Sequence, residues 1–571
     1  MLQNEWVLAP QAPAEHLQRY QGFSPILAQL LFNRGFEEPA TARRFVHHSD
    51  LNDDPFKMQD MDIAVARINH AIAERQLIAV YGDFDADGVC ATTLMAQVLA
   101  SLGADVMPYI PDRAEEGYGL NKPALQGLAQ NGVELVVTVD CGIRSVAQVA
   151  ASARDGLDII VTDHHSIGPD LPPALAVINP RREDCPGEAN MAGVGVAFML
   201  AKALLLQRWE TDRDNYPRDL RLSDLLDLVA LGTVADVMPL NVGLNRRLVR
   251  HGLETINEFR RPGLNALATV AGLRPGSIRA SHIGFALGPR INAAGRLKSA
   301  MIAFELLSAA SHEEAMPRAI ELQRLNMRRQ DETRKAQVAI SEQVLDGGDA
   351  PLIFASDENI LPGIVGLVAG KLAEEFYRPA VVLEIGEQQS RASCRSIPEF
   401  DITRALDECA DLLVRHGGHA MAAGFTVNNS NIDALQQELQ NKAQASLSGK
   451  ILRRRLRIDR EISLTELRMD LLAELDQLEP TGQENAPATF MTRNLKVLHH
   501  RRVGADGNHL KLKLASNGSS AIDAIGFGLG EWSKTLPRRI DVAYHPEINE
   551  WNGKRSLQMH LLDIRPAESA C

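Results

Sequence analysis

The chain has 571 residues, which is too long for one hydrophobic core, and roughly three or four domains are expected from this length. Its formal net charge of -13 argues against a protein that binds polyanions over its whole surface, because phosphate contacts need Lys and Arg. Six scattered cysteines without a C-x-x-C pair argue against a disulfide framework and a thiolate zinc site, and they indicate a reducing compartment.

The sequence suggests neither an export signal at its start nor a membrane-spanning segment. The sequence MLQNEWVLAP lacks both a basic region and an apolar core. The longest nearly apolar run, residues 193–206, is short for a bilayer span and contains Lys202. We therefore expect a cytoplasmic protein that does not cross a membrane. Residues 1–70 have helical spacing and are predicted to form a helical extension that packs on the domain that follows.

Residues 71–240 are predicted to form an α/β domain. The apolar runs LIAVYG, VELVVTVD and LDIIVTD are separated by segments with helical periodicity. Continuous apolar strands with helices between them predict a parallel sheet that is covered on both faces. Ligands bind such a sheet at the carboxyl ends of its strands.

The pattern changes twice along the rest of the chain. Residues 241–349 are predicted to be mostly helical and to end in a long connecting helix over residues 313–345. Residues 350–447 predict a second α/β domain, with the strands PLIFASD and RPAVVLEI on either side of a helix. Residues 448–571 predict an all-β domain, because LRRRLRID, HLKLKLAS, IDAIGFG, RIDVAYH and RSLQMHLLDI alternate with period two, and an Asn-Gly hairpin turn falls at residues 552–553. About five strands of this length fit a partly open, OB-like nucleic-acid-binding barrel, with a plain β-sandwich as the alternative.

Residues 80–89, VYGDFDADGV, place three carboxylates at alternate positions directly after an apolar run. Asp83, Asp85 and Asp87 match the first positions of an EF-hand calcium loop, but position twelve is Leu94 instead of the required Glu. The EF-hand interpretation therefore fails. A solvated Asp-rich turn remains the simple alternative for this stretch alone.

Two further strands also end in acids. Asp140 follows VELVVTV, the triplet Asp163-His164-His165 follows LDIIVT, and Asp236 follows a later apolar run, LVALGTVA. Parallel strands end at the same edge of a sheet, so these side chains are expected to converge with the acids of residues 83–87. Carboxylates within a few ångströms of one another repel strongly unless cations neutralise their charge. An oxygen-rich set with imidazoles and no thiolate favours two Mn²⁺ or Mg²⁺ ions, as in phosphoryl hydrolysis, and a salt-bridged acidic edge is the alternative.

Four motifs carry a resemblance to a known family. The segments GDFDADG, TVDCG, TDHHS and GTVADVMPL resemble the motifs of the DHH phosphoesterases. Within that family, GPRINAAGR at residues 288–296, RASCRS at 391–396 and RHGGHAMAAG at 415–424 are similar to segments of the bacterial exonucleases specific for single-stranded DNA. The resemblance covers nearly the whole chain. It implies that residues 71–240 form a DHH catalytic domain and that residues 350–447 form a DHH-associated substrate-binding domain.

The resemblance also implies a role for individual residues. Asp85 and Asp87 match metal ligands, Asp140 matches an acid that bridges two ions, and His164 and Asp236 match further ligands. Asp163 is expected to support the cluster or to ligate, and His165 to contact the scissile phosphate. Many members place a histidine at Tyr81, so Asp83 or water is expected to complete the first metal's ligands. The expected substrate-binding residues are His165, Arg290, Asn292, Arg296, Ser393, Arg395, Gly417, Gly418 and His419.

The resemblance implies a metal-dependent 5′-to-3′ exonuclease that degrades single-stranded DNA to mononucleotides in DNA repair and recombination. It further implies a monomer that works with a single-strand binding protein and a RecQ-type helicase. Two alternatives remain: a DHH hydrolase of short oligoribonucleotides or cyclic dinucleotides, and a non-catalytic DNA-binding scaffold of the same fold.

Overall fold

A computed structural model describes residues 4–567, except residues 114, 187, 242, 347, 349, 358–359, 517–519 and 552–553. The chain divides into two compact units. The central unit comprises residues 51–238 and 243–452, and the terminal unit comprises residues 1–50, 239–242 and 453–571. Within the described residues, no helix is long and apolar enough to cross a membrane.

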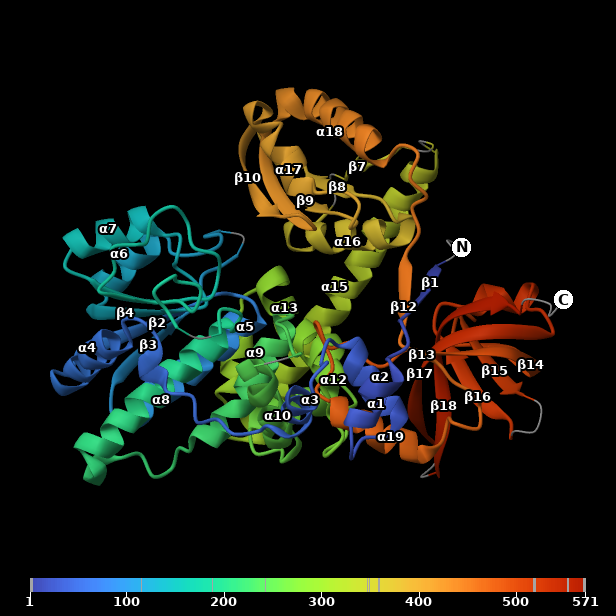
Figure 1. Cartoon of the computed structure of the whole chain (residues 1–571). Helices are drawn as coiled ribbons and strands as arrows, with labels where there is room; N and C mark the ends of the chain where they lie inside the picture. Colours follow the sequence, from blue (N-terminus) through green and yellow to red (C-terminus); the bar gives the residue numbers. More distant parts are fainter. Residues whose placement is uncertain are drawn as a thin grey trace. The chain divides into compact units, whose positions relative to one another are not determined.

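The central unit begins with the predicted parallel sheet, in the strand order β3-β2-β4-β5-β6. Helices α6 and α7 cover one face of this sheet, and α5 and α8 cover the other (Figure 1). The strand order reverses between β2 and β4, and ligands bind open α/β sheets at such a switch point. The elements are β2 (Leu77–Gly82), α5 (Ala86–Ser101), β3 (Asp105–Tyr109), α6 (Lys122–Gln130), β4 (Val133–Val139), α7 (Val146–Arg154), β5 (Asp158–Thr162), β6 (Ala176–Ile178) and α8 (Gly193–Thr211).

A helical region follows the sheet, as predicted. It ends in the long connecting helix α15, which has 35 residues. A π-helical turn at Ile283–Leu287 precedes α13. The helices are α4 (Met61–Ala73), which precedes the sheet, and α9 (Leu226–Ala235), α10 (Gly243–Asn257), α11 (Pro262–Val270), α12 (Ala280–His282), α13 (Gly288–Leu297), α14 (Met301–Leu307) and α15 (His312–Asp346).

The second α/β domain has the strand order β10-β11-β9-β8-β7, in which only β7 and β8 run parallel. Ser393 pairs with Gly424, which pairs with Gly417, and Arg395 pairs through Ala422 with His419. Paired residues point to the same side of a sheet, so these predicted substrate residues share one face. The elements are β7 (Ile353–Ser356), α16 (Val365–Phe376), β8 (Ala380–Glu384), β9 (Gln389–Arg395), α17 (Ile402–Asp407), β10 (Leu413–His419), β11 (Ala422–Asn428) and α18 (Ile432–Leu447).

The terminal unit contains a five-stranded β-barrel that is closed by pairing of β14 with β17. One predicted strand is assigned differently: β12 (Arg455–Ile458) pairs with β1 (Glu5–Leu8) outside the barrel, and β14 supplies the first barrel strand. The predicted turn at residues 552–553 lies outside the described residues. The barrel strands are β14 (Phe490–Val503), β15 (His509–Ala515), β16 (Ile522–Gly526), β17 (Arg539–Trp551) and β18 (Lys554–Pro566).

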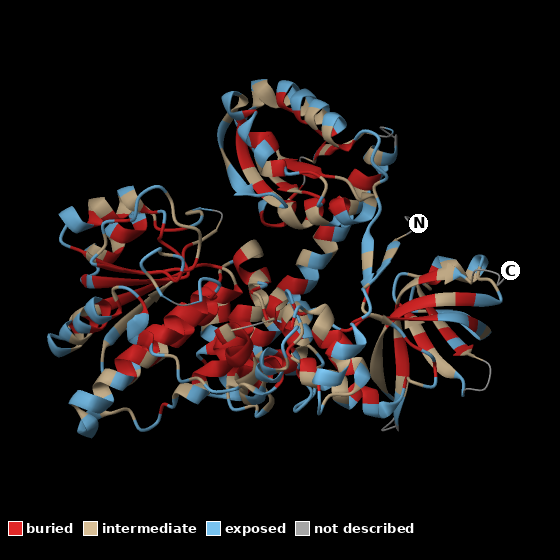
Figure 2. Cartoon of the chain, viewed as in Figure 1, coloured by how far each residue is buried: buried red, intermediate tan, exposed pale blue. Residues whose placement is uncertain are grey.

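Residues 4–50 belong to the terminal unit, which corrects the expectation that this stretch packs on the catalytic domain, whereas residues 51–70 lie in the central unit, where α4 contacts α8 and β6. Helices α1 (Ala14–Arg19), α2 (Pro25–Asn33) and α3 (Pro39–His47) form one hydrophobic cluster with α19 (Met469–Leu475) and the barrel strands. The apolar side of α2 is almost fully buried there, and Figure 2 shows these helices and strands with buried inner faces. An amphipathic helix needs such a partner surface, and the sequence does not reveal which one it takes.

Candidate active site

The predicted acids converge at the carboxyl edge of the first sheet. Asp83 follows β2, Asp140 follows β4, and Asp163 and both histidines follow β5, which are three neighbouring strands. Helix α5 contributes Asp85 and Asp87 from its N-terminal end, and Asp236 lies at the C-terminal end of α9. The sequence pattern placed these residues at one edge, and the folded chain brings their side chains together.

Potential ligand atoms from these side chains lie within 4.8 Å of one another in three groups. Asp140 occurs in two of the three groups, which is the position that a bridging carboxylate needs. The groups are Asp83 with Asp85 and Asp140, Asp87 with His164 and Asp236, and Asp140 with His164 and His165.

The cluster carries unsatisfied buried polar atoms. Asp83 Oδ1 is buried without a hydrogen-bond partner among the described residues, and Asp140 Oδ1 faces the imidazole of His164 without forming a hydrogen bond of good geometry. His164 Nε2 lies 3.1 Å from Asp140 Oδ1 and 3.5 Å from Asp236 Oδ2. Uncompensated buried carboxylates are costly, so atoms that point at a common centre fit a bound cation.

The electrostatics of the cluster support the same conclusion. Burial, and next the neighbouring carboxylates, raise the pKa of Asp83, Asp87 and Asp140 well above the usual range. Burial and the Asp85 carboxylate raise the pKa of Asp236 to about 7. Burial lowers the pKa of His164 to about 4, so its imidazole is neutral and able to ligate. Such a set of oxygens with one imidazole fits Mn²⁺ or Mg²⁺.

Backbone groups and glycines hold these carboxylates in place. Asp87 accepts hydrogen bonds from the N–H groups of Gly193 (2.7 Å) and Val194 (3.0 Å), at the positive end of α8. Asp85 caps α5 by accepting from the N–H of Asp87 at 2.8 Å. A side chain at Gly193 would collide with Asp140, and one at Gly232 would collide with Asp87. Only glycine at these two positions lets α8 and α9 approach Asp140 and Asp87 this closely.

Asp163 supports the cluster without joining it. Its carboxylate accepts hydrogen bonds from the N–H groups of Ile143 (2.9 Å), His164 (2.7 Å) and His165 (3.0 Å), and it lies 2.8 Å from His165 Nδ1. None of the three groups found among the described residues includes Asp163. Burial opposes ionisation, yet these hydrogen bonds hold the pKa of Asp163 below its usual value. The structure thus favours support over ligation for this residue.

His165 is the accessible member of the pair of histidines. Its side chain is 41% exposed, whereas that of His164 is 6% exposed. Its Nδ1 lies 3.1 Å from the Tyr118 hydroxyl as well as 2.8 Å from Asp163. Burial opposes protonation, but the Asp163 hydrogen bond raises the pKa of His165 overall. The ring can therefore act as a cationic donor at the site.

Tyr81, at the position where the resemblance led us to expect a histidine, is fully buried. Its hydroxyl donates to the carbonyl of Gly119 (3.1 Å) and accepts from Asn121 Nδ2 (3.2 Å). The phenol is thus bonded to the loop after β3, and the first group of potential ligands consists of carboxylates alone.

A basic cleft of about 680 Å³ adjoins the acidic cluster. Asp83 and Asp85 act electrostatically on Arg113 in its wall, and Asp85 also acts on Arg296. Burial, and next Arg113, lower the pKa of Arg296 to about 10, which still leaves a cation at neutral pH. Clustered cations of this kind fit phosphate groups. The six cations of the lining are Arg113, Arg296, Lys298, Arg328, Arg391 and Arg395, and the three acids are Asp112, Glu115 and Glu384.

The cleft contains three of the predicted substrate residues. Arg296, Ser393 and Arg395 line it. Gly417, Gly418 and His419 lie outside its lining, on the exposed strand β10 of the same sheet.

Two further predicted substrate residues hold helices together instead. Asn292 Oδ1 accepts from the N–H of Ala86 at 2.7 Å, at the start of α5. Arg290 donates to Gln323 Oε1 at 2.8 Å and to the carbonyl of Ala286 in the π-helical turn at 2.7 Å, so it ties α13 to α15 and to that turn. Both side chains are therefore engaged by protein groups in this structure.

Sequence reasoning missed Arg113 and Tyr118, and it did not count Arg328 or Arg391 among the substrate residues, although Arg391 begins the RASCRS segment. Arg113 and Tyr118 follow β3, whose sequence DVMPY was not recognised as a strand. The rule that drew attention to the acids, polar residues at the carboxyl end of a parallel strand, applies equally to Arg113. Arg391 alternates with Ser393 and Arg395 on one face of β9, a spacing that the sequence does contain.

A parallel sheet with clustered acids at its carboxyl edge, followed by a second α/β domain, defines a DHH-type phosphoesterase. The profile of the DHH family, N-terminal domain, matches residues 77–233, that of the DHHA1 domain matches residues 349–445, and that of the RecJ OB domain matches residues 458–563. The chain belongs to the RecJ family.

Similarity to individual proteins of the family supports this assignment. The single-stranded-DNA-specific exonuclease RecJ of Bacillus subtilis is 37% identical over 95% of this chain and 68% of its own length. That of Salmonella typhimurium is 35% identical over 95% of this chain and 96% of its own. The crystal structure of RecJ in complex with Mn²⁺ from Thermus thermophilus superposes with a TM-score of 0.82 and 30% identity, over 99% of this chain and 80% of that one.

Proposed function

We propose that this chain is a metal-dependent exonuclease specific for single-stranded DNA, which hydrolyses phosphodiester bonds from the 5′ end and releases mononucleotides. The observation that carries the proposal is a buried carboxylate cluster that adjoins a cleft with six cationic side chains. The RecJ relatives, named for this activity, and the relative in complex with Mn²⁺ support it.

The chain's own residues divide between holding metal and holding substrate. Asp83, Asp85 and Asp140 would hold one divalent cation, and Asp87, His164 and Asp236 would hold a second with Asp140 between them. When bound, two such ions supply activation of a water and stabilisation of the attacking and leaving oxygens. His165, held by Asp163, would donate a hydrogen bond to the scissile phosphate.

The cleft residues would position the DNA backbone. Arg395 donates to the Ser393 hydroxyl at 3.3 Å and to the carbonyl of Cys394 at 2.8 Å, which orients the guanidinium on the strand face. Burial lowers the pKa of Arg395, and an anionic group beside the guanidinium would raise it again. We assign phosphate binding to Arg296, Ser393 and Arg395, and a weaker outer contact to His419 and the glycines of β10.

The barrel offers a surface for the rest of the strand. On its outer face His499 pairs with Lys513, and Arg501 pairs with Lys511. Phe527 is 54% exposed, and its ring lies edge-on to those of His509 (5.1 Å) and His560 (5.2 Å). Cations beside exposed rings suit phosphates and stacked bases. We assign guidance of single-stranded DNA to this face.

The cellular setting completes the proposal. The protein would act in the cytoplasm as a monomer, in DNA repair and recombination, on strands supplied by a RecQ-type helicase and held by a single-strand binding protein. Free thiols at all five described cysteines suit a reducing compartment. The domain division would be 1–70, 71–240, 241–349, 350–447 and 448–571, with residues 1–50 sharing the core of the last domain.

The decisive experiment offers labelled DNA to the purified chain. We expect Mn²⁺ or Mg²⁺ to support stepwise cleavage of a single strand, with no cleavage in a chelator and little cleavage of a blunt duplex. Oligonucleotides blocked at the 5′ or the 3′ end test direction, and only the 5′ block should protect. Equal cleavage of both duplex and single strand would contradict the proposal.

A further inference from the structure

The loop between β3 and α6 connects the sheet to the substrate cleft. Arg113 lies 4.9 Å above the Phe84 ring and lines the basic cleft. Tyr118 places its hydroxyl 3.1 Å from His165 Nδ1 and its ring edge-on to His165 at 5.6 Å. Two side chains of one loop therefore touch the cleft and the catalytic histidine.

Hydrogen bonds to one carboxylate hold this loop. Glu116 accepts from the Tyr109 hydroxyl at 2.7 Å, from the N–H of Asp112 at 2.8 Å and from Asn121 Nδ2 at 2.9 Å. These three partners come from the end of β3, the start of the loop and the residue that caps α6. The Glu116 side chain thus joins both ends of the loop.

Tyr81 supplies a second anchor from beneath. Its hydroxyl bonds the carbonyl of Gly119 and also meets Asn121. Gly117 and Gly119 have φ angles of 80° and 82°, so the loop turns sharply on either side of Tyr118. The tyrosine at this position of the first motif therefore holds the loop instead of binding metal.

The two ends of the loop are packed, but its middle is not. Ile110 and Leu120 are 7% and 3% exposed, and Leu120 belongs to the core beneath the sheet, whereas Tyr118 is 55% exposed. A cavity of about 540 Å³ adjoins the loop and is lined by Met107, Tyr109, Glu116, Asn121 and the start of α6. The exposed middle of the loop therefore depends on hydrogen bonds for its position.

We propose that Glu116 is a positioning residue for the nuclease reaction, which fixes the loop so that Arg113 and Tyr118 stay at the cleft and at His165. Tyr81 and Tyr109 are its partners in this role. The inference rests on the proposed function, since the loop matters only if the cleft takes DNA.

The test compares Glu116→Ala with wild type and with Glu134→Ala. Glu134 is an exposed carboxylate at the start of β4, at the edge of the sheet opposite the site, so the control removes the same charge. We expect Glu116→Ala to lower kcat/KM on single-stranded DNA by about 10- to 100-fold, mainly through KM, because misplaced binding groups cost this much. The control should match wild type. Mn²⁺ affinity should stay unchanged in both variants.

A second readout does not depend on activity. Release of the loop should speed hydrogen exchange at the Gly117 amide, which donates to the Asp112 carbonyl, in Glu116→Ala but not in wild type or Glu134→Ala. If Glu116→Ala folds poorly, Glu116→Gln and Tyr109→Phe keep most of the site and should show smaller changes in the same direction. In a double-mutant cycle, Tyr109→Phe should add little to Glu116→Ala, because both remove one interaction.

The outcomes separate the two proposals. Wild-type protein without nuclease activity would contradict the proposed function, and hydrogen exchange at Gly117 would still test the loop. Active wild type with an unchanged KM in Glu116→Ala, or a loss of Mn²⁺ binding in that variant, would overturn the positioning role.

Discussion

At the scale of single residues, Asp140 has the most constrained position in the site. It is buried, it belongs to two groups of potential ligands, and its φ of 63° lies in the left-handed region. A non-glycine residue in that region carries strain that the surrounding structure must offset. Asp and Asn tolerate the region better than most residues, so a carboxylate can sit at the strand end with a sharp change of chain direction.

We expect Asp140→Asn to abolish hydrolysis and leave folding intact. Asparagine keeps the left-handed backbone and the side-chain shape, but it removes the charge that two cations would share. Single-strand binding in the absence of turnover should persist, measured by fluorescence anisotropy, while Mn²⁺ affinity falls. The matched control is Asp155→Asn, at an exposed aspartate that ends α7. Retained activity, or an unfolded Asp140→Asn protein, would contradict the assignment.

His419 allows a test of the outer strand of the substrate domain. Its side chain is on the same sheet face as Arg395, two strands away, and the Thr403 hydroxyl donates to its backbone carbonyl and not to its ring. We expect His419→Ala to raise KM by roughly up to tenfold, the cost of about one charged or polar phosphate contact, with Mn²⁺ affinity unchanged. His416→Ala removes an imidazole from the opposite face of β10 and should leave KM unaltered. A loss of metal from His419→Ala would contradict this placement.

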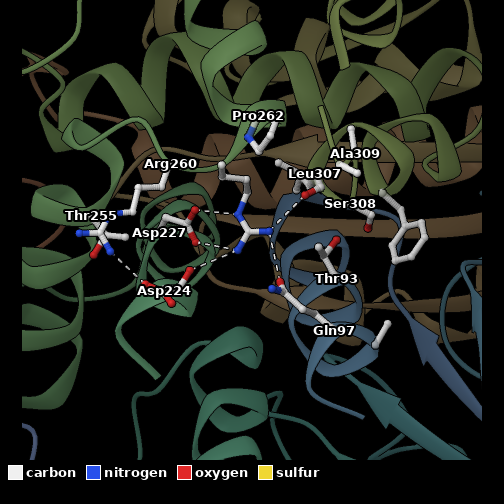
Figure 3. Close-up of a pocket in the computed structure, with 14 residues that line it drawn as sticks. Thr93, Gln97, Asp224, Asp227, Thr255, Arg260, Pro262, Leu307, Ser308 and Ala309 are labelled. Atoms are coloured by element: carbon white, nitrogen blue, oxygen red, sulfur yellow. Dashed lines mark hydrogen bonds and ion pairs between the residues drawn. The ribbon is translucent and has the colours of Figure 1, made fainter. Parts of the chain in front are cut away.

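At the scale of elements, helices α5 and α9 carry proposed metal ligands at one end, and a buried ion network joins their other ends. Arg261, before α11, donates to Asp227 of α9 at 2.7 Å, to Gln97 of α5 at 3.3 Å and to the carbonyl of Leu307 in α14 at 3.2 Å. These groups converge at a cavity of about 510 Å³ (Figure 3). One guanidinium thus links α5, α9 and α14 to the start of α11, at the ends of α5 and α9 that lie away from Asp87 and Asp236.

Loss of this guanidinium should destabilise the central unit. The side chains of Arg261 and Asp227 are 11% and 4% exposed, so Arg261→Ala leaves a buried carboxylate unpaired. Breaking a buried pair from one side costs about 3–5 kcal/mol, whereas an exposed pair contributes about 1 kcal/mol or less. The neighbouring Arg260, 56% exposed and paired with Glu258, is the matched control. Urea unfolding of both variants measures the difference, and equal midpoints would contradict the structural role of Arg261.

The elements that sequence analysis found and missed differ in a physical way. Strands β2, β4 and β5 are buried on both faces, so they appear as continuous apolar runs and their ends mark the site. Strand β3 is half-buried and contains Pro108, so it has no such run, and Arg113 was missed with it. The pairing of β1 with β12 joins segments about 450 residues apart in sequence, for which no local pattern exists.

At the scale of the whole molecule, the two ends of the chain share one hydrophobic core. Leu27, Leu30 and Leu31 of α2 are at most 1% exposed, and they belong to the same cluster as Phe490 and Tyr544 of the barrel. Helical spacing in the sequence predicted that α2 has an apolar side but not what covers it. Deleting one end of the chain would therefore expose apolar surface of the other end, so both parts of this core have to be removed together.

Two truncated chains test this organisation together with the role of the barrel. Removal of residues 453–571 alone should expose the apolar side of α2, so that the product binds hydrophobic dyes and aggregates in size-exclusion chromatography. A chain of residues 51–452 loses both parts of that core and should stay folded, with Leu240→Ser added because Leu240, 1% exposed, belongs to the terminal unit.

The 51–452 chain should hydrolyse very short oligonucleotides with a kcat close to that of the full chain, because the acids and the basic cleft all lie in the central unit. Its affinity for long single strands should fall, since an OB fold contributes a site of about 4–16 nucleotides, and the slope of log affinity against log salt should flatten with the lost cations. If both chains bind long single strands with equal affinity and equal salt dependence, the barrel does not contribute to DNA binding. A well-behaved C-terminal deletion would show instead that residues 1–50 do not depend on the barrel for their fold.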